Sequence, residues 1–185
     1  MNKHNIFPLL AVTALLSACG NEPTTEVDAE GASPALIANA ILSGANIDAT
    51  GEAIAADGDG KILLKVNVKG LAVGEYGVHI HSIGNCEAPD YKSAGGHWNP
   101  AQTEHGINNP NGAHKGDIPN LVVAEDGTGS LEASIDARLA GEENSLLDAD
   151  GASFMVHAGP DDLATDPSGN SGARIMCGVF ANTKA

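Results

Sequence analysis

The chain has 185 residues, with 24 acidic and nine basic side chains and a formal net charge of −15. This length is enough for one domain with a substantial buried core. The strong negative charge argues against a protein that binds nucleic acid or anionic lipid headgroups electrostatically. Aromatic residues make up only 3% of the chain, so we expect a core of Val, Ile, Leu and Ala.

Residues 1–18 resemble a secretory signal. Lys3 precedes an apolar run over residues 6–16, which is too short to span a bilayer. The sequence LSAC follows and resembles a bacterial lipoprotein box, which implies cleavage before Cys19 and a lipid on its sulfur. The alternative is an ordinary signal with an incidental cysteine. Gly20 stands where an acidic residue would favour the inner membrane, so we expect an anchor in the outer membrane, on the periplasmic side of the cell envelope.

Residues 19–34 and 35–185 differ in character. The first range is polar and acidic without apolar periodicity, so we expect a tether between lipid and domain. The second contains short β-type segments, with a hairpin signal at Asp57-Gly58-Asp59-Gly60 and strict apolar–polar alternation over residues 61–69. About eight such strands and no strong helix predict an all-β fold, an eight-stranded antiparallel Greek-key barrel or sandwich.

Two long loops interrupt these strands. The first fills most of the stretch from Gly77 to Asp117 and is rich in Gly, Pro and Asn, and the second runs from Pro160 to Gly172. Loops of this length in a compact domain are usually functional. Six of the seven histidines lie in or beside these loops, and the seventh, His4, lies in the predicted signal.

The histidines in strands are candidates for copper. His79 and His81 are two residues apart on a predicted strand, so both imidazoles project from the same face. The pair alone is equally consistent with two incidental histidines. Together with His157 and one further imidazole, the pair would supply four nitrogens, which suits tetragonal copper(II).

The histidines of the first loop are candidates for zinc. His97, His105, His114 and Asp117 would make a closed tetrahedral site of three nitrogens and one oxygen, which suits zinc. Six histidines are too few for two independent sites unless one is shared. His97 is the natural bridge, because an imidazolate can bind a metal through each of its nitrogens.

Two cysteines remain once the signal and Cys19 are set aside. Cys86 and Cys177 form an even pair in a chain that we expect to be exported, which predicts a disulfide. Two reduced, buried thiols are the alternative.

Several motifs, taken in chain order, resemble one known family. They are GVHIHSIGNC, SAGGHWNP, the His-Gly at His105, HKGDIPNLVV, FMVHAGPDDL and GNSGARIMCGV. Over residues 36–180 the chain resembles the copper/zinc superoxide dismutases. The resemblance implies a domain over 35–185 that dismutates superoxide to oxygen and hydrogen peroxide by redox cycling of copper, here in protection of the cell envelope. It leaves both a monomer and a homodimer open.

The resemblance also implies roles for individual residues. Copper would be held by His79, His81, His97 and His157. Zinc would be held by His97, His105, His114 and Asp117. Arg174 would be a guanidinium beside the copper, Asp161 would hydrogen-bond one copper histidine and one zinc histidine, and Cys86 would pair with Cys177.

The sequence departs from the animal pattern in its two loops. The segment between Cys86 and His97 is enlarged by EAPDYKSAGG, and the loop from Asp161 to Arg174 has no lysine to guide the substrate. Removal of Lys3 with the signal leaves eight of the nine basic residues against 24 acidic ones, a net charge of −16. Lys92 in the enlarged loop is therefore a candidate for steering superoxide.

A non-enzymatic periplasmic copper- or zinc-binding protein on the same fold is the rival interpretation.

Overall fold

The computed structural model describes residues 36–141 and 145–183, which form an all-β domain with one short 3-10 turn. The predicted signal, Cys19 and tether lie outside the described residues. The strands are β1 Ile37–Gly44, β2 Thr50–Gly58, β3 Lys61–Lys69, β4 Gly74–Tyr76, β5 Val78–His81, β6 Leu121–Val123, β7 Thr128–Ile135, β8 Ser153–His157, β9 Arg174–Val179 and β10 Ala181–Asn182, and the turn η1 is Lys92–Ala94. No helix in the described ranges is long and apolar enough to cross a membrane.

The strands form one antiparallel sheet that almost closes on itself. Their order is β4-β6-β7-β3-β2-β1-β9-β8-β5, and β10 pairs with β1. Only Gly77 separates β4 from β5, so the first and last strands in this order belong to one continuous segment of the chain. Similarly, only Phe180 separates β9 from β10. When each interrupted strand is counted once, the sheet has the eight strands that the sequence predicts, and the predicted antiparallel barrel is confirmed.

The interior of the barrel is aliphatic, as the composition predicts. Along β3 the side chains alternate without exception between exposed and buried, and Ile62, Leu64, Val66 and Val68 face the core. The hairpin between β2 and β3 turns at Asp59 and Gly60, whose φ angles of 48° and 82° are those of a two-residue turn with two left-handed positions.

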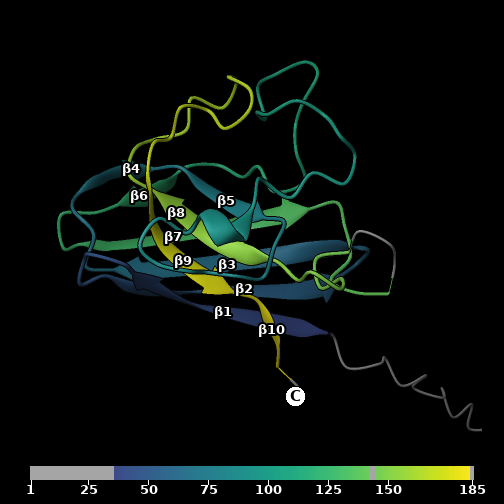
Figure 1. Cartoon of the computed structure of the whole chain (residues 1–185), viewed down its shortest axis with the longest axis horizontal. Coiled ribbons are helices and arrows are strands. Elements are labelled where there is room, and N and C mark those ends of the chain that lie inside the picture. The colour runs from purple at the N-terminus through teal and green to yellow at the C-terminus, as the bar shows by residue number, and fades with distance from the viewer. Residues whose placement is uncertain (1–35, 142–144, 184–185) are drawn as a thin grey trace, which may run out of the picture. The chain divides into compact units, whose positions relative to one another are not determined.

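Both long loops lie on the same side of the strands, in teal and yellow in Figure 1. They occupy residues 82–120, between β5 and β6, and residues 158–173, between β8 and β9. The loops also bond to each other, because Asn108 N–H donates to the carbonyl of Leu163 at 2.9 Å and His105 N–H donates to Asp166 Oδ1 at 2.7 Å. The histidines are thereby gathered over one outer face of the barrel.

The predicted disulfide is present. Cys86, in the first loop, is bonded to Cys177, in β9, across 91 residues of sequence. The bond is covered by a small apolar cluster that includes Tyr91, Ala94 and Met155. It fastens the first loop to the strand that begins with Arg174.

Replacing both cysteines by serine should lower the free energy of unfolding by roughly 4–5 kcal/mol, because the crosslink no longer restricts a long loop of the unfolded chain. Urea denaturation of the metal-free proteins, with and without a reductant, measures this change. The wild-type protein should fall to the level of the double variant when reduced, and the variant should not respond to reductant. Equal unfolding midpoints for the oxidised wild type and the variant would contradict the expectation.

Candidate metal centre

Strand β5 supplies the first two histidines of the site. Val78 and Ile80 face the aliphatic core, so His79 and His81 project from the opposite face of the sheet. Both imidazoles are fully buried beneath the loops, with their ring centroids 6.4 Å apart. The shared face expected from their spacing is thus the one that the loops cover.

The free edge of β5 holds the first loop against the barrel. Ile80 donates its N–H to the carbonyl of Gly116 at 3.0 Å and accepts at its own carbonyl from Trp98 N–H at 2.8 Å. Any side chain at position 116 would collide with the Ile80 carbonyl, so glycine is required for this approach. The loop residues that pair with β5 are His97, opposite His81, and Asp117, opposite His79.

Four buried imidazole nitrogens in this region have no hydrogen-bond partner among the described residues. They are His79 Nδ1, His81 Nε2, His97 Nε2 and His157 Nε2. The four residues also form a group whose ligand atoms lie within 4.8 Å of one another. An unpaired buried polar atom is unfavourable, and four that converge indicate a ligand that needs lone pairs. Four imidazole nitrogens suit copper(II), so the residues fit the predicted copper site.

The second nitrogen of each of these rings faces an oxygen atom, which fixes the orientation of the ring; that of His97 faces Asp117. In the other three rings the nitrogen that faces the oxygen carries the proton, so the opposite nitrogen presents its lone pair. The contacts are His79 Nε2 to Asp161 Oδ2 at 2.6 Å, His81 Nδ1 to the Gly95 carbonyl at 3.0 Å and His157 Nδ1 to the Gly172 carbonyl at 3.2 Å.

A second cluster is centred on Asp117. Its Oδ1 lies 2.9 Å from His97 Nδ1, 3.0 Å from His105 Nδ1 and 3.2 Å from His114 Nδ1. Two ligand atoms of a tetrahedral zinc ion with bonds of about 2.0 Å lie about 3.3 Å apart. The observed separations are close to this edge length, so three nitrogens and one oxygen fit a tetrahedral zinc ion.

Distance alone also groups His79 with His97, His105 and Asp117. His79, however, directs Nε2 to Asp161 and has Nδ1 among the four unpaired nitrogens. His114 Nδ1, in contrast, lies 3.4 Å from His97 Nδ1 and is also close to Asp117. We therefore take His114 as the fourth member of the second cluster, as the sequence predicts.

Asp161 connects the two clusters. Its Oδ2 faces His79, and its Oδ1 lies 3.1 Å from His105 Nε2, as the resemblance implies. Asn120 holds this residue from behind, since its side-chain amide exchanges two hydrogen bonds of 2.9 Å with the backbone of Asp161. Gly169, in the left-handed region with φ of 60°, passes so close that any side chain there would collide with the carboxylate.

Burial favours the neutral form of the four imidazoles that have an unpaired nitrogen. Burial lowers the pKa of His81 to about 2, that of His157 to about 3 and that of His97 to about 4. Burial also lowers the pKa of His79. Neutral rings leave one nitrogen of each free to bind a metal without first releasing a proton.

The two aspartates of the centre are ionised. Burial alone would raise the pKa of Asp117, but the hydrogen bonds from His97 and Gly106 outweigh it and hold the pKa well below its ordinary value. The same balance lowers the pKa of Asp161, where the bond to His79 is the largest opposing contribution. Two carboxylates would therefore offset part of the charge of bound cations.

The stability of the metal-free protein should fall as the pH is lowered from 7 towards 4. The unfolded histidines take up protons near pH 6.5, whereas the buried ones resist protonation until pH 4 or below, so the unfolded state binds more protons in this window. Each such histidine should lower the unfolding free energy by about 1.4 kcal/mol per pH unit. Urea midpoints of chelator-treated protein at pH 7, 6 and 5 measure the slope. His157→Gln should flatten it, and a wild-type midpoint independent of pH would be inconsistent with the burial.

Arg174 is held in the same region by the enlarged loop. Its Nη1 donates to the carbonyl of Tyr91 at 2.7 Å, and its Nη2 donates to the carbonyl of Gly95 at 2.7 Å. The Gly95 carbonyl also accepts from His81. The guanidinium and the His81 ring therefore share one acceptor, and β9 pairs Arg174 with His157.

The lysines of the loops are directed elsewhere. Lys92 lies in η1 and pairs with Asp90 at 2.8 Å, with 84% of its side chain exposed. Lys115 donates to the carbonyl of Asp136 at 2.6 Å. Lys92 remains a candidate for steering the substrate, but Asp90 offsets its charge.

The supporting roles of several residues are not visible in the sequence. The acceptors of Gly95 and Gly172 are backbone carbonyls, which any residue could supply, and Asn120 and Asp166 lie 41 and 61 residues from the groups that they hold. In the sequence, Gly169 stands out only as part of the motif GNSGARIMCGV. These contacts depend on how distant loops pack, which spacing along the chain does not reveal.

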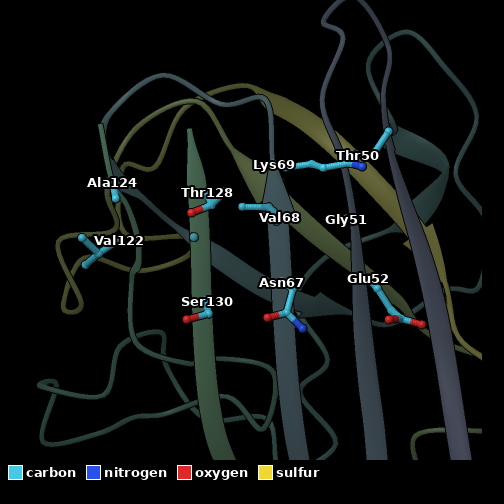
Figure 2. Close-up of a pocket in the computed structure, with 11 residues that line it drawn as sticks. Thr50, Gly51, Glu52, Asn67, Val68, Lys69, Val122, Ala124, Thr128 and Ser130 are labelled. Atoms are coloured by element: carbon cyan, nitrogen blue, oxygen red, sulfur yellow. The ribbon is translucent and has the colours of Figure 1, made fainter. Parts of the chain in front are cut away.

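A broad groove lies elsewhere, on the outer face of β2, β3 and β7 (Figure 2). Its lining includes Glu52, Asn67, Lys69 and Ser130, and none of its 11 residues is a histidine or cysteine. The metal-binding chemistry of the described residues therefore lies under the loops and not in this groove.

Comparison with known proteins identifies the family to which this chain belongs. A family model for copper/zinc superoxide dismutase (SODC) matches residues 49–180. The chain is 46% identical to a Cu-Zn superoxide dismutase of Caulobacter vibrioides over 123 residues, covering 64% of this chain and 71% of the relative. It is 39% identical to Cu-Zn superoxide dismutase 2 of Aquifex aeolicus over 148 residues, covering 78% and 86%.

A superoxide dismutase-like protein of Bacillus subtilis, YojM, is 48% identical over 106 residues, covering 56% of this chain and 54% of the relative. A crystal structure of a SOD-like protein from Bacillus subtilis matches with a TM-score of 0.72 and 38% identity, covering 77% of this chain and 97% of that one. The chain therefore belongs to the copper/zinc superoxide dismutase family, whose cofactors are copper and zinc.

Proposed function

We propose that the chain dismutates superoxide in the cell envelope at a copper ion and a zinc ion that share one histidine. Copper would be held by His79, His81, His97 and His157. Zinc would be held by His97, His105, His114 and Asp117. The superoxide dismutase class follows from the family, and the shared histidine is the part that we propose from the site.

The position of His97 carries this proposal. Its Nδ1 lies in the cluster around Asp117, and its Nε2 is one of the four unpaired nitrogens of the other cluster. One ring would thus contribute a nitrogen to each metal site. The ring is also 4% exposed, so bulk water has little access to it.

The reaction converts two superoxide anions and two protons into oxygen and hydrogen peroxide. When bound, copper would take an electron from one superoxide and give it to the next. Arg174 would bind each anion through its positive charge and orient it towards the site. Nε2 of His97 would hold one of the two protons between the half-reactions, since it is a buried ring nitrogen of this chain with no other partner among the described residues. Asp161 and the carbonyls of Gly95 and Gly172 would keep the remaining rings in one orientation.

The test of the function is direct. Protein reconstituted with copper and zinc should inhibit superoxide-dependent reduction of cytochrome c, and chelation of the metals should abolish the inhibition. A fully metallated protein without this activity would overturn the proposal.

A non-enzymatic copper- and zinc-binding role is the second candidate. It is favoured by the likeness to a relative that is described only as superoxide dismutase-like. Against it stands the placement of Arg174 beside the four nitrogens, because a binding protein has no need of an anion site there. The cytochrome c assay separates the two, since a storage protein would hold both metals and leave superoxide untouched.

We also propose an outer-membrane lipid anchor on the periplasmic side. The LSAC sequence ending at Cys19 supports it, and so does the disulfide, which is stable in an oxidising compartment. The acidic tether of residues 19–34 would place the domain away from the membrane surface.

Replacing Cys19 by serine should move the protein from the membrane fraction to the soluble periplasmic fraction. The serine side chain has no sulfur to carry a thioether-linked lipid. The protein therefore loses the lipid anchor that would hold the domain to the bilayer. Cell fractionation with immunoblotting and mass spectrometry of the N-terminus measure both effects. Wild-type protein recovered as a soluble form with an unmodified cysteine at its N-terminus would count decisively against the anchor.

A further inference from the structure

We propose that Tyr91 is a positioning residue for Arg174, because it fixes the peptide group on which the guanidinium rests. The inference deepens the proposed function and rests on it, since it concerns the residue that binds the substrate anion. Tyr91 lies in the enlarged segment EAPDYKSAGG, in which the proposed reaction uses only the carbonyl of Gly95.

Two carbonyls hold the guanidinium, and one of them belongs to Tyr91. The hydrogen bonds from Nη1 to Tyr91 and from Nη2 to Gly95 are both 2.7 Å long. Hydrogen bonds from a charged donor are short, strong and directional. The direction of the guanidinium therefore depends on where these two carbonyls point.

The backbone at Tyr91 is in an uncommon conformation. Its φ of 51° and ψ of 25° lie in the left-handed region, which bulky residues rarely adopt. Such a conformation persists only where the surroundings impose it. Here the N–H of Tyr91 donates to the carbonyl of Glu87 at 3.0 Å, and its carbonyl accepts from Ala94 N–H at 3.1 Å.

The side chain of Tyr91 ties this strained peptide to the barrel. The residue is 3% exposed and belongs to the small cluster with Met155 and Cys177. Its hydroxyl donates to the carbonyl of Ser43 at 2.9 Å, and Ser43, in β1, lies opposite Cys177 in β9. The hydroxyl thus forms a second fastening of the loop, beside the disulfide.

The disulfide alone does not determine the position of the carbonyl. Cys86 precedes Tyr91 by five residues, and the four residues between them, one proline, one alanine and two acidic residues, make no side-chain bond to the barrel of the kind that the hydroxyl makes. Removal of the hydroxyl removes this bond to β1 and frees the peptide of Tyr91 to relax out of the left-handed region. The guanidinium of Arg174 would follow its acceptor away from the anion site.

The experiment compares two tyrosine-to-phenylalanine variants. Tyr91→Phe keeps the buried ring and removes only the hydroxyl. Tyr76→Phe is the matched control, because it removes a similar bond, from the hydroxyl to the carbonyl of Ala72 at 2.9 Å, away from Arg174. The readout is the Kd of azide, a small monovalent anion, measured by the visible absorption of the copper(II) protein at verified metal content. We expect Tyr91→Phe to raise this Kd by about three- to fivefold, the scale of one net hydrogen bond, and Tyr76→Phe to leave it unchanged.

The same substitution in an Arg174→Ala background shows whether Tyr91 acts through the arginine. We expect no further change in azide Kd there, because the two residues act as one unit. A Tyr91→Phe protein with the wild-type Kd, or an equal loss in the Arg174→Ala background, would overturn the positioning role while the proposed function stands. A wild-type metallated protein that neither binds azide nor dismutates superoxide would overturn the proposed function and this inference with it.

Discussion

A His97→Ala protein is expected to lose both metals, and its dismutase activity with them. The ring supplies Nδ1 to the cluster around Asp117 and Nε2 to the four-nitrogen cluster, so its removal takes one ligand from each site. Groups that only orient a ligand contribute about 10–100-fold to metal affinity, and loss of a ligand itself should cost more than this. Metal content per chain after reconstitution, together with the cytochrome c assay, measures the effect.

Two further variants serve as controls for the shared histidine. His157→Ala should lose mainly copper, because its unpaired Nε2 lies only in the four-nitrogen cluster. His114→Ala should lose mainly zinc, because its Nδ1 lies beside Asp117 and His97. Three distinct patterns of metal loss are therefore expected. Comparable retention of both metals in His97→Ala would show that the bridge is wrongly assigned.

The strands could be predicted from sequence because their signals are local. The alternation over residues 61–69 reports directly on which side chains of β3 face the core, and Asp59-Gly60 supplies the two left-handed residues of the hairpin turn. The interruptions at Gly77 and Phe180 were missed, since they depend on which neighbouring strand each segment pairs with. β4 pairs with β6, whereas β5 pairs with β8, and no local pattern records that change of partner.

The same distinction applies to the metal centre. The spacing of His79 and His81 indicates a shared face, and the family motifs name the remaining candidate ligands. The orientation of the rings could not be predicted, because it depends on the carbonyls of Gly95 and Gly172, which leave no mark in the sequence. Likewise, nothing in the sequence shows that Asp90 offsets the charge of Lys92.

An Arg174→Ala protein should retain both metals and lose at least about tenfold in kcat/KM, the lower end of the range for electrostatic steering. The net charge of −15, from nine basic and 24 acidic residues, should repel anions. Lys65, Lys92 and Lys115 each lie within ion-pair distance of a carboxylate. Arg174, by contrast, bonds only to backbone carbonyls among the described residues, so no carboxylate is paired directly with its guanidinium.

Lys92→Ala is the matched control, because it removes one positive charge from the same loop without touching the metal clusters. If Lys92 steers superoxide, this variant should lose severalfold in kcat/KM and respond less to added salt than the wild type, because screening then has less attraction to remove. Because Asp90 offsets the charge of Lys92, the expected loss in kcat/KM is smaller than that of Arg174→Ala. Identical salt profiles for Lys92→Ala and wild type would eliminate Lys92 as a guide. A loss in Lys92→Ala as large as that in Arg174→Ala would place the attraction of the anion in the exposed loop and not in the guanidinium that Tyr91 and Gly95 hold.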